Sequence, residues 1–485
     1  MKNSFDIGIV GSGPAGMGAA IAISRMAPHL RVVIFEKGAN RFNVPASEAN
    51  VTEGCGGAGA FSDGKFNLDA TGRVGGQLVP NGFMSQDRWD HLLRSSAALY
   101  TEFGGNADRQ FGHTDSETEG RVEELRRIGR GHRLELHRFP ILHLGTSTAT
   151  TIVENWRLEL ERLGVTTITD CYVREFEACG DSWKLKTDQG EFQVKKVIAC
   201  PGRSGSQWFQ EVAKGLGIVM DNNGIDIGVR VETSNDIMSE LIRLFYEAKL
   251  YFRVHENDDR LRTFCMCPGG RVAIEVYRDT GILCANGHTD DAEQTANCNF
   301  AVLQTQTFTE PFNDPHGYGS NIARLCNAVG EGILVQRLGD LQRHRRSTPA
   351  RMLEGMVAAT CTDARVTPGD IATVLPARFL HGILSMLKAL DSVAPGIAGP
   401  DTLLYLPEIK WNAVRARADA TRGYEALPGF HVAGDGTGYT RGLNGATIHG
   451  MDVGLWVAQA MGGADISPYR DKMVNQGAWD RLFKQ

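Results

Sequence analysis

A short glycine-rich turn near the N-terminus, GSGPAG at residues 11–16, most constrains the fold of this chain. It follows the run FDIGIV at 5–10, whose apolar residues suit a strand that is buried on both faces. An Ala- and Ile-rich helical stretch follows to about Ala27, and RVVIFE at 31–36 suits a second strand. The order of strand, turn, helix and strand therefore predicts an α/β fold that is built on a parallel sheet.

The spacing of the three glycines in this turn predicts a dinucleotide site. Gly11 allows the tight turn, Gly13 lets backbone amides approach a pyrophosphate, and Gly16 lets the helix pack close to the strand. Glu36 ends the second strand, twenty residues after Gly16, where a carboxylate accepts hydrogen bonds from an adenosine ribose and repels a 2′-phosphate. The pattern indicates FAD or NAD rather than NADP. The alternative is a glycine turn that is only structural.

The next segment favours FAD over NAD. After Lys37 the chain does not continue as alternating strands and helices but enters GCGGAGAFSDGK at 54–65, which contains five glycines. Glycines without Cβ atoms let backbone amides reach an isoalloxazine ring and a pyrophosphate. The alternative is a mobile glycine loop.

Two later segments indicate the same kind of domain. Residues 166–202 have the pattern of a β-meander that leads back into an apolar strand. Residues 428–461 predict a strand, an acidic residue at its end, a glycine-rich turn and an Ala/Gly-rich helix. The N-terminus of this helix would favour the negative edge of a reduced flavin, and Asp435 is placed to hold a ribityl hydroxyl. The alternative role of Asp435 is a helix cap.

These motifs resemble those of a known family. GGAGAFSDGK at 56–65, LHLGTSTATTIVENWR at 142–157, FCMCPGGRV at 264–272, NG at 286–287 and GDGTGYTRG at 434–442 are similar to the FAD-dependent dehydrogenases of the glutathione-reductase-like flavoprotein superfamily, relatives of the HI0933-like flavoproteins. The resemblance covers most of the chain and implies a discontinuous Rossmann-type FAD-binding domain, with a parallel sheet and a β-meander, joined to an α+β substrate domain. It implies non-covalent FAD and places the SDGKFN element at 62–67 beside the isoalloxazine.

The motifs and the resemblance together predict the cofactor-binding residues. The resemblance assigns the adenosine diphosphate to the first turn and to Glu36, the adenine to the backbone of Val173, and the ribityl and pyrimidine to Asp435 and 442–446. The turn TRGLNGA at 440–446 departs from the GGI-like turn of relatives. The full predicted set is Gly11, Gly13, Pro14, Ala15, Gly16, Glu36, Lys37, Gly57, Ala58, Ser62, Asp63, Gly64, Val173, Gly202, Gly434, Asp435, Gly442, Leu443, Asn444 and Ala446.

Two cations are candidates for catalysis. Lys65 follows the flavin-facing glycines, where it could stabilise negative charge that arrives with a hydride; the alternative is a surface lysine paired to Asp63. Arg441 offers a planar guanidinium to the flavin or to a substrate carboxylate. Cys265 and Cys267 would share one face of a regular strand, too far apart for a comfortable disulfide, so we expect packing cysteines.

Length and composition suit two domains. The chain has 485 residues, of which 42% are hydrophobic and 22% charged. We expect a discontinuous FAD-binding domain at 1–75, 140–225 and 400–475, an insertion at 76–139 and a substrate domain at 226–399. APGIAGP at 394–400 would be the linker back to the first domain.

Charge and cysteine usage exclude several classes. A net charge of −6 and a pI near 6.1 provide no electrostatic footprint for nucleic acid or for an anionic bilayer. The N-terminus enters a strand at once and no window has the length of a membrane span, so we expect a cytoplasmic protein. The ten cysteines lack paired CxxC spacing, so no metal site is expected.

The leading functional hypothesis is an oxidoreductase that transfers a hydride between FAD and an organic small molecule. A flavin monooxygenase or halogenase is the alternative, although the WxWxIP signature of halogenases is absent. A third is a non-enzymatic flavin-binding module. Residues 75–430 contain no convincing second GxGxxG, so we expect no separate NAD(P)H domain. The expected partners are a small-molecule substrate and either NAD(P)H at the same site or another redox partner.

Overall fold

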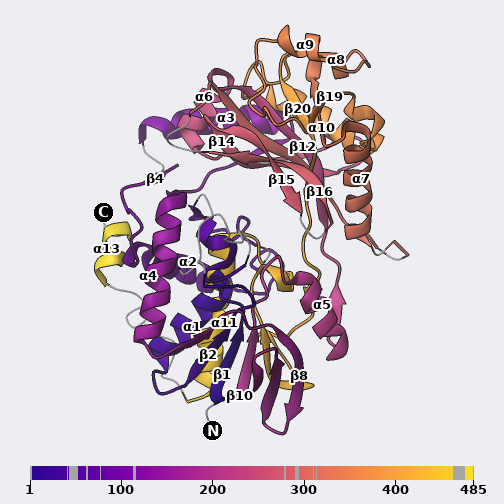
Figure 1. Cartoon of the computed structure of the whole chain (residues 1–485). Helices are drawn as coiled ribbons and strands as arrows, with labels where there is room; N and C mark the ends of the chain where they lie inside the picture. Colours follow the sequence, from indigo (N-terminus) through magenta and orange to yellow (C-terminus); the bar gives the residue numbers. More distant parts are fainter. Residues whose placement is uncertain are drawn as a thin grey trace. The chain divides into compact units, whose positions relative to one another are not determined.

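The computed structural model describes residues 3–40, 42, 53–61, 64–76, 78–112, 116–277, 280–289, 294–309, 311–312, 314–462 and 476–483. The chain divides into two compact units (Figure 1). Unit 1 comprises Met1–Phe111, Pro140–Asp221 and Ala413–Gln485, and unit 2 comprises Gly112–Phe139 and Asn222–Asn412.

Unit 1 is built on an eight-stranded sheet with a parallel centre. Strand β1 lies between β10 and β2 and is parallel to both, and β2 and β10 pair in parallel with β7 and β23 respectively. The meander β8–β9–β10 is antiparallel and leads into the central sheet, as the sequence predicts. The strands are β1 Ser4–Val10, β2 Val32–Phe35, β7 Thr166–Ile168, β8 Val173–Cys179, β9 Ser182–Thr187, β10 Gly190–Ala199, β22 Gly423–Tyr424 and β23 Leu427–Val432.

Two glycine-rich helices of unit 1, α1 Pro14–Met26 and α11 Leu443–Ala460, pack closely against each other. A Cβ at Gly450 would lie 1.9 Å from the carbonyl oxygen of Ala15, and one at Gly18 would lie 2.8 Å from that of Thr447. Glycine at these positions therefore brings the two helix starts together. The other elements are α2 Gln86–Glu102, α4 Thr146–Arg162, α5 Ser206–Gly215, α13 Gln476–Phe483, the sheet of β3 Lys65–Asn67, β6 Ile141–His143 and β4 Gln110–Phe111, and the pair β11 Met220–Asp221 with β21 Arg415–Ala416.

Unit 2 has its own eight-stranded sheet and core. All neighbouring pairs are antiparallel except β18 with β19. The sheet order is β19 Val366–Pro368, β18 Ile333–Arg337, β20 Leu403–Lys410, β12 Ile225–Ser234, β17 Asn297–Gln306, β14 Arg260–Pro268, β13 Lys249–Arg253 and β5 Leu134–His137. A hairpin of β15 Arg271–Tyr277 and β16 Ile282–His288 accompanies it, with helices α3 Ser116–Gly131, α6 Asn235–Phe245, α7 Pro315–Gly330, α8 Leu338–Leu341, α9 Pro349–Leu353 and α10 Ala377–Leu390. The two units confirm the predicted α/β class: a Rossmann-type unit and a second, α+β unit.

The boundaries of the units differ from those expected from the sequence. Residues 76–111, expected in an insertion, lie in unit 1, because α2 packs against α11 and contributes buried residues to the unit 1 core. Residues 400–412 lie in unit 2, because β20 pairs with β12 and β18. The segment 394–400 is a turn of unit 2 and not a linker, since Ala394 and Ile397 are buried in its core.

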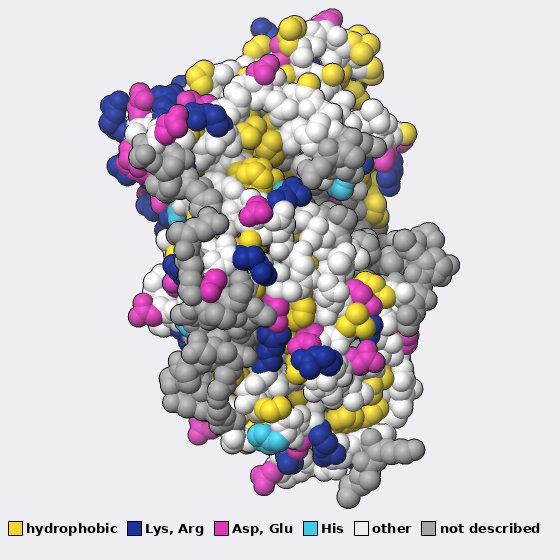
Figure 2. Space-filling model, turned by 90° about the vertical axis from the view of Figure 1, so that its left-hand side faces the viewer, with side chains coloured by type: hydrophobic (Ala, Val, Ile, Leu, Met, Phe, Trp, Pro, Cys, Tyr) yellow, Lys and Arg dark blue, Asp and Glu magenta, His cyan; other side chains and the backbone are white. Residues whose placement is uncertain are grey.

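On the face shown in Figure 2, Lys and Arg side chains are interspersed with Asp and Glu. Among the described residues, no helix has the length and apolar character needed to cross a bilayer.

Candidate functional site

The turn between β1 and α1 has the geometry that its glycines predict. Gly11 has a φ of +101°, and a Cβ there would lie 2.2 Å from the carbonyl oxygen of Cys200. A Cβ at Gly16 would lie 1.9 Å from the carbonyl oxygen of Gly11. A Cβ at Gly13, in contrast, would meet no described atom within 4 Å. Gly11 and Gly16 therefore serve the turn itself, whereas Gly13 leaves open space beside the start of α1.

The starts of α1 and α11 are alike in their N-cap residues. Gly13 and Gly442 are the N-cap residues, and because both are glycines, neither provides a side-chain cap for its helix. A Cβ at Gly442 would also meet no described atom within 4 Å. The first N–H groups of a helix have no partner within the helix and carry partial positive charge, so they attract anions. Both helix starts therefore suit a negatively charged group such as a phosphate.

The carboxylate of Glu36 is buried and contacts the turn between β1 and α1. Its Oε2 accepts hydrogen bonds from the N–H and the Oγ of Ser12, at 2.9 and 2.8 Å. Its Oε1 accepts from the N–H groups of Gly38 and Gly54, at 2.9 and 3.0 Å. These four bonds match the acceptor sites of a carboxylate. In this structure Glu36 thus joins three backbone segments, and the ribose contact expected of it remains a prediction.

The glycine segment that follows Glu53 packs against both helix starts. The N–H of Gly56 donates to the carbonyl of Ser12 at 2.9 Å. A Cβ at Gly59 would lie 2.7 Å from Cγ of Pro14 and 3.3 Å from Cδ1 of Leu443. The three glycine-rich stretches that the sequence singles out, 11–16, 54–60 and 434–446, therefore meet in one place within unit 1.

Asp435 organises the turn before α11. Its Oδ1 accepts from Oγ1 of Thr440 at 2.7 Å, and its Oδ2 accepts from the N–H of Gly442 at 3.0 Å. Burial raises the pKa of Asp435, although these two bonds and the charges of Arg203 and Arg441 act in the opposite direction. Asp435 thus holds the N-cap residue of α11, and its expected contact with a ribityl hydroxyl remains a prediction.

The two predicted catalytic cations lie on segments that contact each other. Lys65 begins β3 and pairs with His143 of β6, and its side chain is half-buried. Further along the same segment, the carbonyl of Gly75 accepts from the N–H of Arg441 at 3.1 Å. The side-chain amide of Asn444 also donates to the carbonyl of Asn67 at 2.7 Å. The structure therefore places 65–76 against 440–445, and the catalytic roles remain predictions.

The other predicted residues lie in varied surroundings. Lys37 forms an ion pair with Glu53 at 2.6 Å. Val173 is buried at the start of β8, and its carbonyl accepts from Nε1 of Trp208 at 2.8 Å. Gly202 has a φ of +64°, in the turn after β10. Ala15, Gly57, Ala58, Gly434 and Ala446 lie on the three glycine-rich stretches, and Gly64 directly precedes β3. Ser62 and Asp63 lie outside the described residues.

Sequence reasoning missed one member of this arrangement, Ser12, whereas the position of His449, one to two turns into α11, favours a core or capping histidine. Ser12 is named by no motif, because the middle positions of GxGxxG are unconstrained. His449 is fully buried in α11, and its Nδ1 accepts from the N–H of Gly434 at 3.0 Å. Burial lowers the pKa of His449 well below 6.5, and the charge of Arg422 acts in the same direction. His449 is therefore neutral and positions the turn that contains Asp435.

In unit 2, Cys265 and Cys267 are free thiols as expected, but the strand that carries them is not regular. The pairing of β14 with β17 shifts register between Phe264 and Cys267, which is a β-bulge. Cys265 has a φ of +47°, and its Sγ lies 4.0 Å from Sγ of Cys267. The expected separation assumed a regular strand, whereas the bulge brings the two sulfur atoms together.

Part of the chain matches a described family. Residues 225–410 match "FAD-dependent protein, C-terminal domain-like", and this range lies in unit 2. The match supports the predictions of FAD as the cofactor and of a flavoprotein oxidoreductase.

Relatives of known sequence or structure add little detail. The chain is 24% identical over 480 residues to an uncharacterized protein of Clostridium beijerinckii, covering 92% of this chain and 79% of the relative. It has a TM-score of 0.38 with glycine oxidase from Geobacillus kaustophilus, at 12% identity and covering 96% of this chain and 98% of that one. L-proline dehydrogenase from P. horikoshii gives 0.38 at 11% identity, covering 96% of each chain. Similarity at this level does not establish a shared activity.

Proposed function

We propose that this chain is an FAD-dependent oxidoreductase that transfers a hydride between FAD and an organic small molecule. We further propose that it belongs with the FAD-dependent dehydrogenases of the glutathione-reductase-like superfamily that its motifs resemble. The observation that carries the proposal is the meeting of three glycine-rich stretches at two helix starts, where no described atom lies within 4 Å of a Cβ added at either N-cap glycine.

The residues present fit a dinucleotide with two phosphates. The start of α1 at Gly13 would hold the pyrophosphate through backbone N–H groups, because Gly13 provides no side-chain cap for these amides. The start of α11 at Gly442 would face the negative edge of the flavin, and Asp435 would orient it. FAD, when bound, supplies an acceptor for a hydride and its pair of electrons.

The chain's own residues would contribute to the chemistry in two ways: they position backbone amides and they supply positive charge. Glu36 holds the turn at Ser12 and the segment at Gly54 in fixed relation, so the amide groups are ordered before a ligand arrives. Lys65 and Arg441 would supply positive charge where negative charge develops. The reductant would be the organic substrate, or NAD(P)H that uses the same site, since residues 75–430 contain no convincing second GxGxxG motif.

A matched pair of glycine variants tests the cofactor site. Gly13→Ala adds a methyl group to the open space beside the start of α1 without strain, because the φ of Gly13 is −72°. Gly215→Ala adds the same methyl group to open space at the end of α5. We expect the unmodified chain and Gly215→Ala to purify yellow with acid-extractable FAD, and Gly13→Ala to lose most of its FAD on dialysis. Equal FAD content in both variants would contradict the assignment.

The reaction class needs its own measurement. Anaerobic titration with pools of metabolites should bleach the flavin spectrum with an organic substrate, and reoxidation should follow with an acceptor. Substrate-dependent oxygen consumption that yields an oxygenated product and water would instead favour the monooxygenase, whereas stoichiometric release of peroxide without oxygenation of the substrate would fit hydride transfer followed by reoxidation with oxygen. Rapid saturable bleaching by NADPH or NADH, which a substrate analogue does not inhibit, would reveal a separate nicotinamide site.

A further inference from the structure

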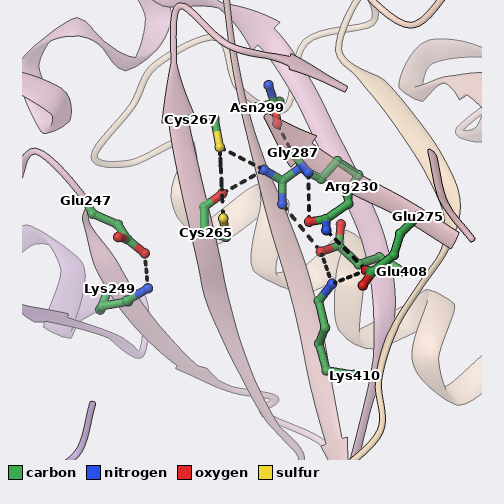
Figure 3. A network of polar contacts seen from close by, with 11 residues as sticks. Arg230, Glu247, Lys249, Cys265, Cys267, Glu275, Gly287, Asn299, Glu408 and Lys410 are labelled. Carbon is green, nitrogen blue, oxygen red and sulfur yellow. Dashed lines mark hydrogen bonds and ion pairs between the residues drawn. The ribbon is translucent and has the colours of Figure 1, made fainter. Parts of the chain in front are cut away.

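A buried arginine in unit 2 makes its best hydrogen bonds to uncharged groups. Arg230 of β12 is fully buried, and its Nε donates to Oδ1 of Asn299 at 2.8 Å. Its Nη2 donates to the carbonyl of Cys265 at 2.7 Å and to Sγ of Cys267 at 3.3 Å. Figure 3 shows the guanidinium directed at the two cysteines of β14. A desolvated cation within hydrogen-bond distance of a thiol stabilises the thiolate form of that thiol.

The guanidinium of Arg230 remains charged because the carboxylate of Glu408 lies beside it. Glu408 of β20 lies 3.4 Å from Nη1 of Arg230 and 3.3 Å from Nζ of Lys410, and Glu275 lies 3.7 Å from the same Nζ. Burial alone would lower the pKa of Arg230, but Glu408, Cys267 and Cys265 raise it. With neutral thiols the two cations balance the two carboxylates. The surroundings therefore carry no excess negative charge that would oppose one further anion at Cys267.

The backbone at Cys265 is strained, and this conformation accompanies the close approach of the two sulfur atoms. Cys265 adopts a positive φ that side chains other than glycine rarely adopt, at a cost of about 1–3 kcal/mol. The bulge lets Cys265 and Cys267 place their sulfur atoms 4.0 Å apart, about 2 Å more than a disulfide bond. Gly287 of β16 makes room for the cation, because a Cβ there would lie 1.6 Å from Nη2 of Arg230. Strain of this kind concentrates at functional sites.

We propose that Cys265 and Cys267 form a redox-active dithiol that exchanges electrons with small-molecule disulfides. Cys265 is half-buried and Cys267 is buried, so Cys265 reacts first and Cys267 second. The Cys265 thiolate attacks one sulfur of the oxidant, forming a mixed disulfide and releasing the first thiolate. The Cys267 thiolate, held by Arg230, then attacks Sγ of Cys265 and releases the second. Two S–H bonds and one S–S bond are lost, one S–S bond forms, and the two protons end on the two released thiols.

The test uses the full-length protein and the glutathione couple. The protein is equilibrated with mixtures of reduced and oxidised glutathione, quenched with acid, alkylated and digested, and the modified peptides are identified by mass spectrometry. We expect an internal Cys265–Cys267 disulfide in the unmodified chain. We expect Cys267→Ser to accumulate the mixed disulfide at Cys265, and Cys265→Ser to leave Cys267 reduced. Cys179 and Cys361, which are also half-buried, serve as internal controls and should form no internal disulfide.

Arg230 is a positioning residue, and its variants separate charge from packing. Arg230→Met should slow resolution of the mixed disulfide by about tenfold, the effect of a shift of one pKa unit, whereas Arg230→Lys should retain most of the rate. If Arg230→Met does not fold, Gly287→Ala replaces it, because it displaces the guanidinium while keeping the charge. A chain that stops at the mixed disulfide, or an Arg230→Met or Gly287→Ala variant that resolves it at the unmodified rate, would overturn the proposal.

Discussion

Oε2 of Glu36 accepts hydrogen bonds from both the N–H and the Oγ of Ser12, so one oxygen atom of the carboxylate holds the middle of the glycine turn. The other oxygen holds Gly38 and Gly54. Loss of this carboxylate therefore affects three segments at once, two of which border the proposed cofactor site.

We expect Ser12→Ala to lower the free energy of unfolding by about 1.5–3 kcal/mol, because it removes one hydrogen bond to a buried carboxylate. Glu36→Ala should lower it by about 2–4 kcal/mol and should weaken FAD retention, since buried amides lose a charged acceptor. Urea unfolding and FAD content after dialysis measure the two effects. Loss of FAD by Ser12→Ala would indicate that Glu36 acts through the turn. Retention by Ser12→Ala with loss by Glu36→Ala would assign the effect to the bonds of Glu36 with Gly38 and Gly54 or to a contact with the ribose.

The close packing of α1 and α11 predicts that one methyl group added between the two helices lowers the stability of the protein. Gly450→Ala places a Cβ 1.9 Å from the backbone oxygen of Ala15, so the helices must separate, at about 1–3 kcal/mol of stability. Gly120→Ala in α3 is the matched control, because its Cβ would enter open space in a helix. We expect this control to gain about 0.5–1 kcal/mol from helix propensity. Thermal unfolding compares the two, and an equal response would contradict the packing argument.

His449 predicts a dependence of stability on pH. Burial lowers the pKa of His449 in the folded chain well below the ordinary 6.5, so the unfolded chain binds more protons between these two pKa values. Stability from this group is complete above pH 6.5 and is lost as the pH falls toward the folded pKa, by up to about 1.4 kcal/mol per pH unit. His449→Asn should flatten this part of the stability profile. An unchanged slope below pH 6.5 would assign the dependence to other groups.

The ion pair of Arg88 with Asp452 predicts an asymmetric mutational response. Asp452 is buried in α11, burial raises its pKa, and Arg88 opposes that rise. Arg88→Met leaves the carboxylate without its cation and should cost about 3–5 kcal/mol at neutral pH. Adding Asp452→Asn should recover part of this loss, because it removes the buried charge. Unfolding of both single variants and the double variant measures the coupling, and simple additivity would contradict it.

The parts of the fold that depend on local sequence patterns could be predicted from the sequence. The turn at Gly11 and Gly16, the meander and the strand–turn–helix at 428–461 follow from spacing alone, because glycine sterics and strand alternation act locally. The bulge at Cys265 could not be predicted, since it depends on how β14 pairs with β17. The four bonds at Glu36 likewise come from segments that are distant in the sequence, and their amides carry no signal in the side-chain pattern.

The predicted boundaries of the two units were wrong for a related reason. APGIAGP at 394–400 has the composition of a linker, but its small apolar residues fill the core of unit 2. Burial of Ala394 and Ile397 depends on partners that no local window contains. The composition of 394–400 therefore predicted a turn correctly, but the expectation that this turn links the two units was wrong.

The division of unit 1 into three chain segments has a consequence for biosynthesis. All of unit 2, including β20, emerges from the ribosome before α11, whereas α1 is the first helix to emerge, directly after β1. Throughout that interval the glycine-lined face of α1 lacks the helix that covers it in the finished protein. Unit 2 can thus close its core first, and arrival of residues 443–460 is the event that completes unit 1. Ribosome-bound chains of increasing length should accordingly resist proteolysis in 222–412 before they do so in 4–35.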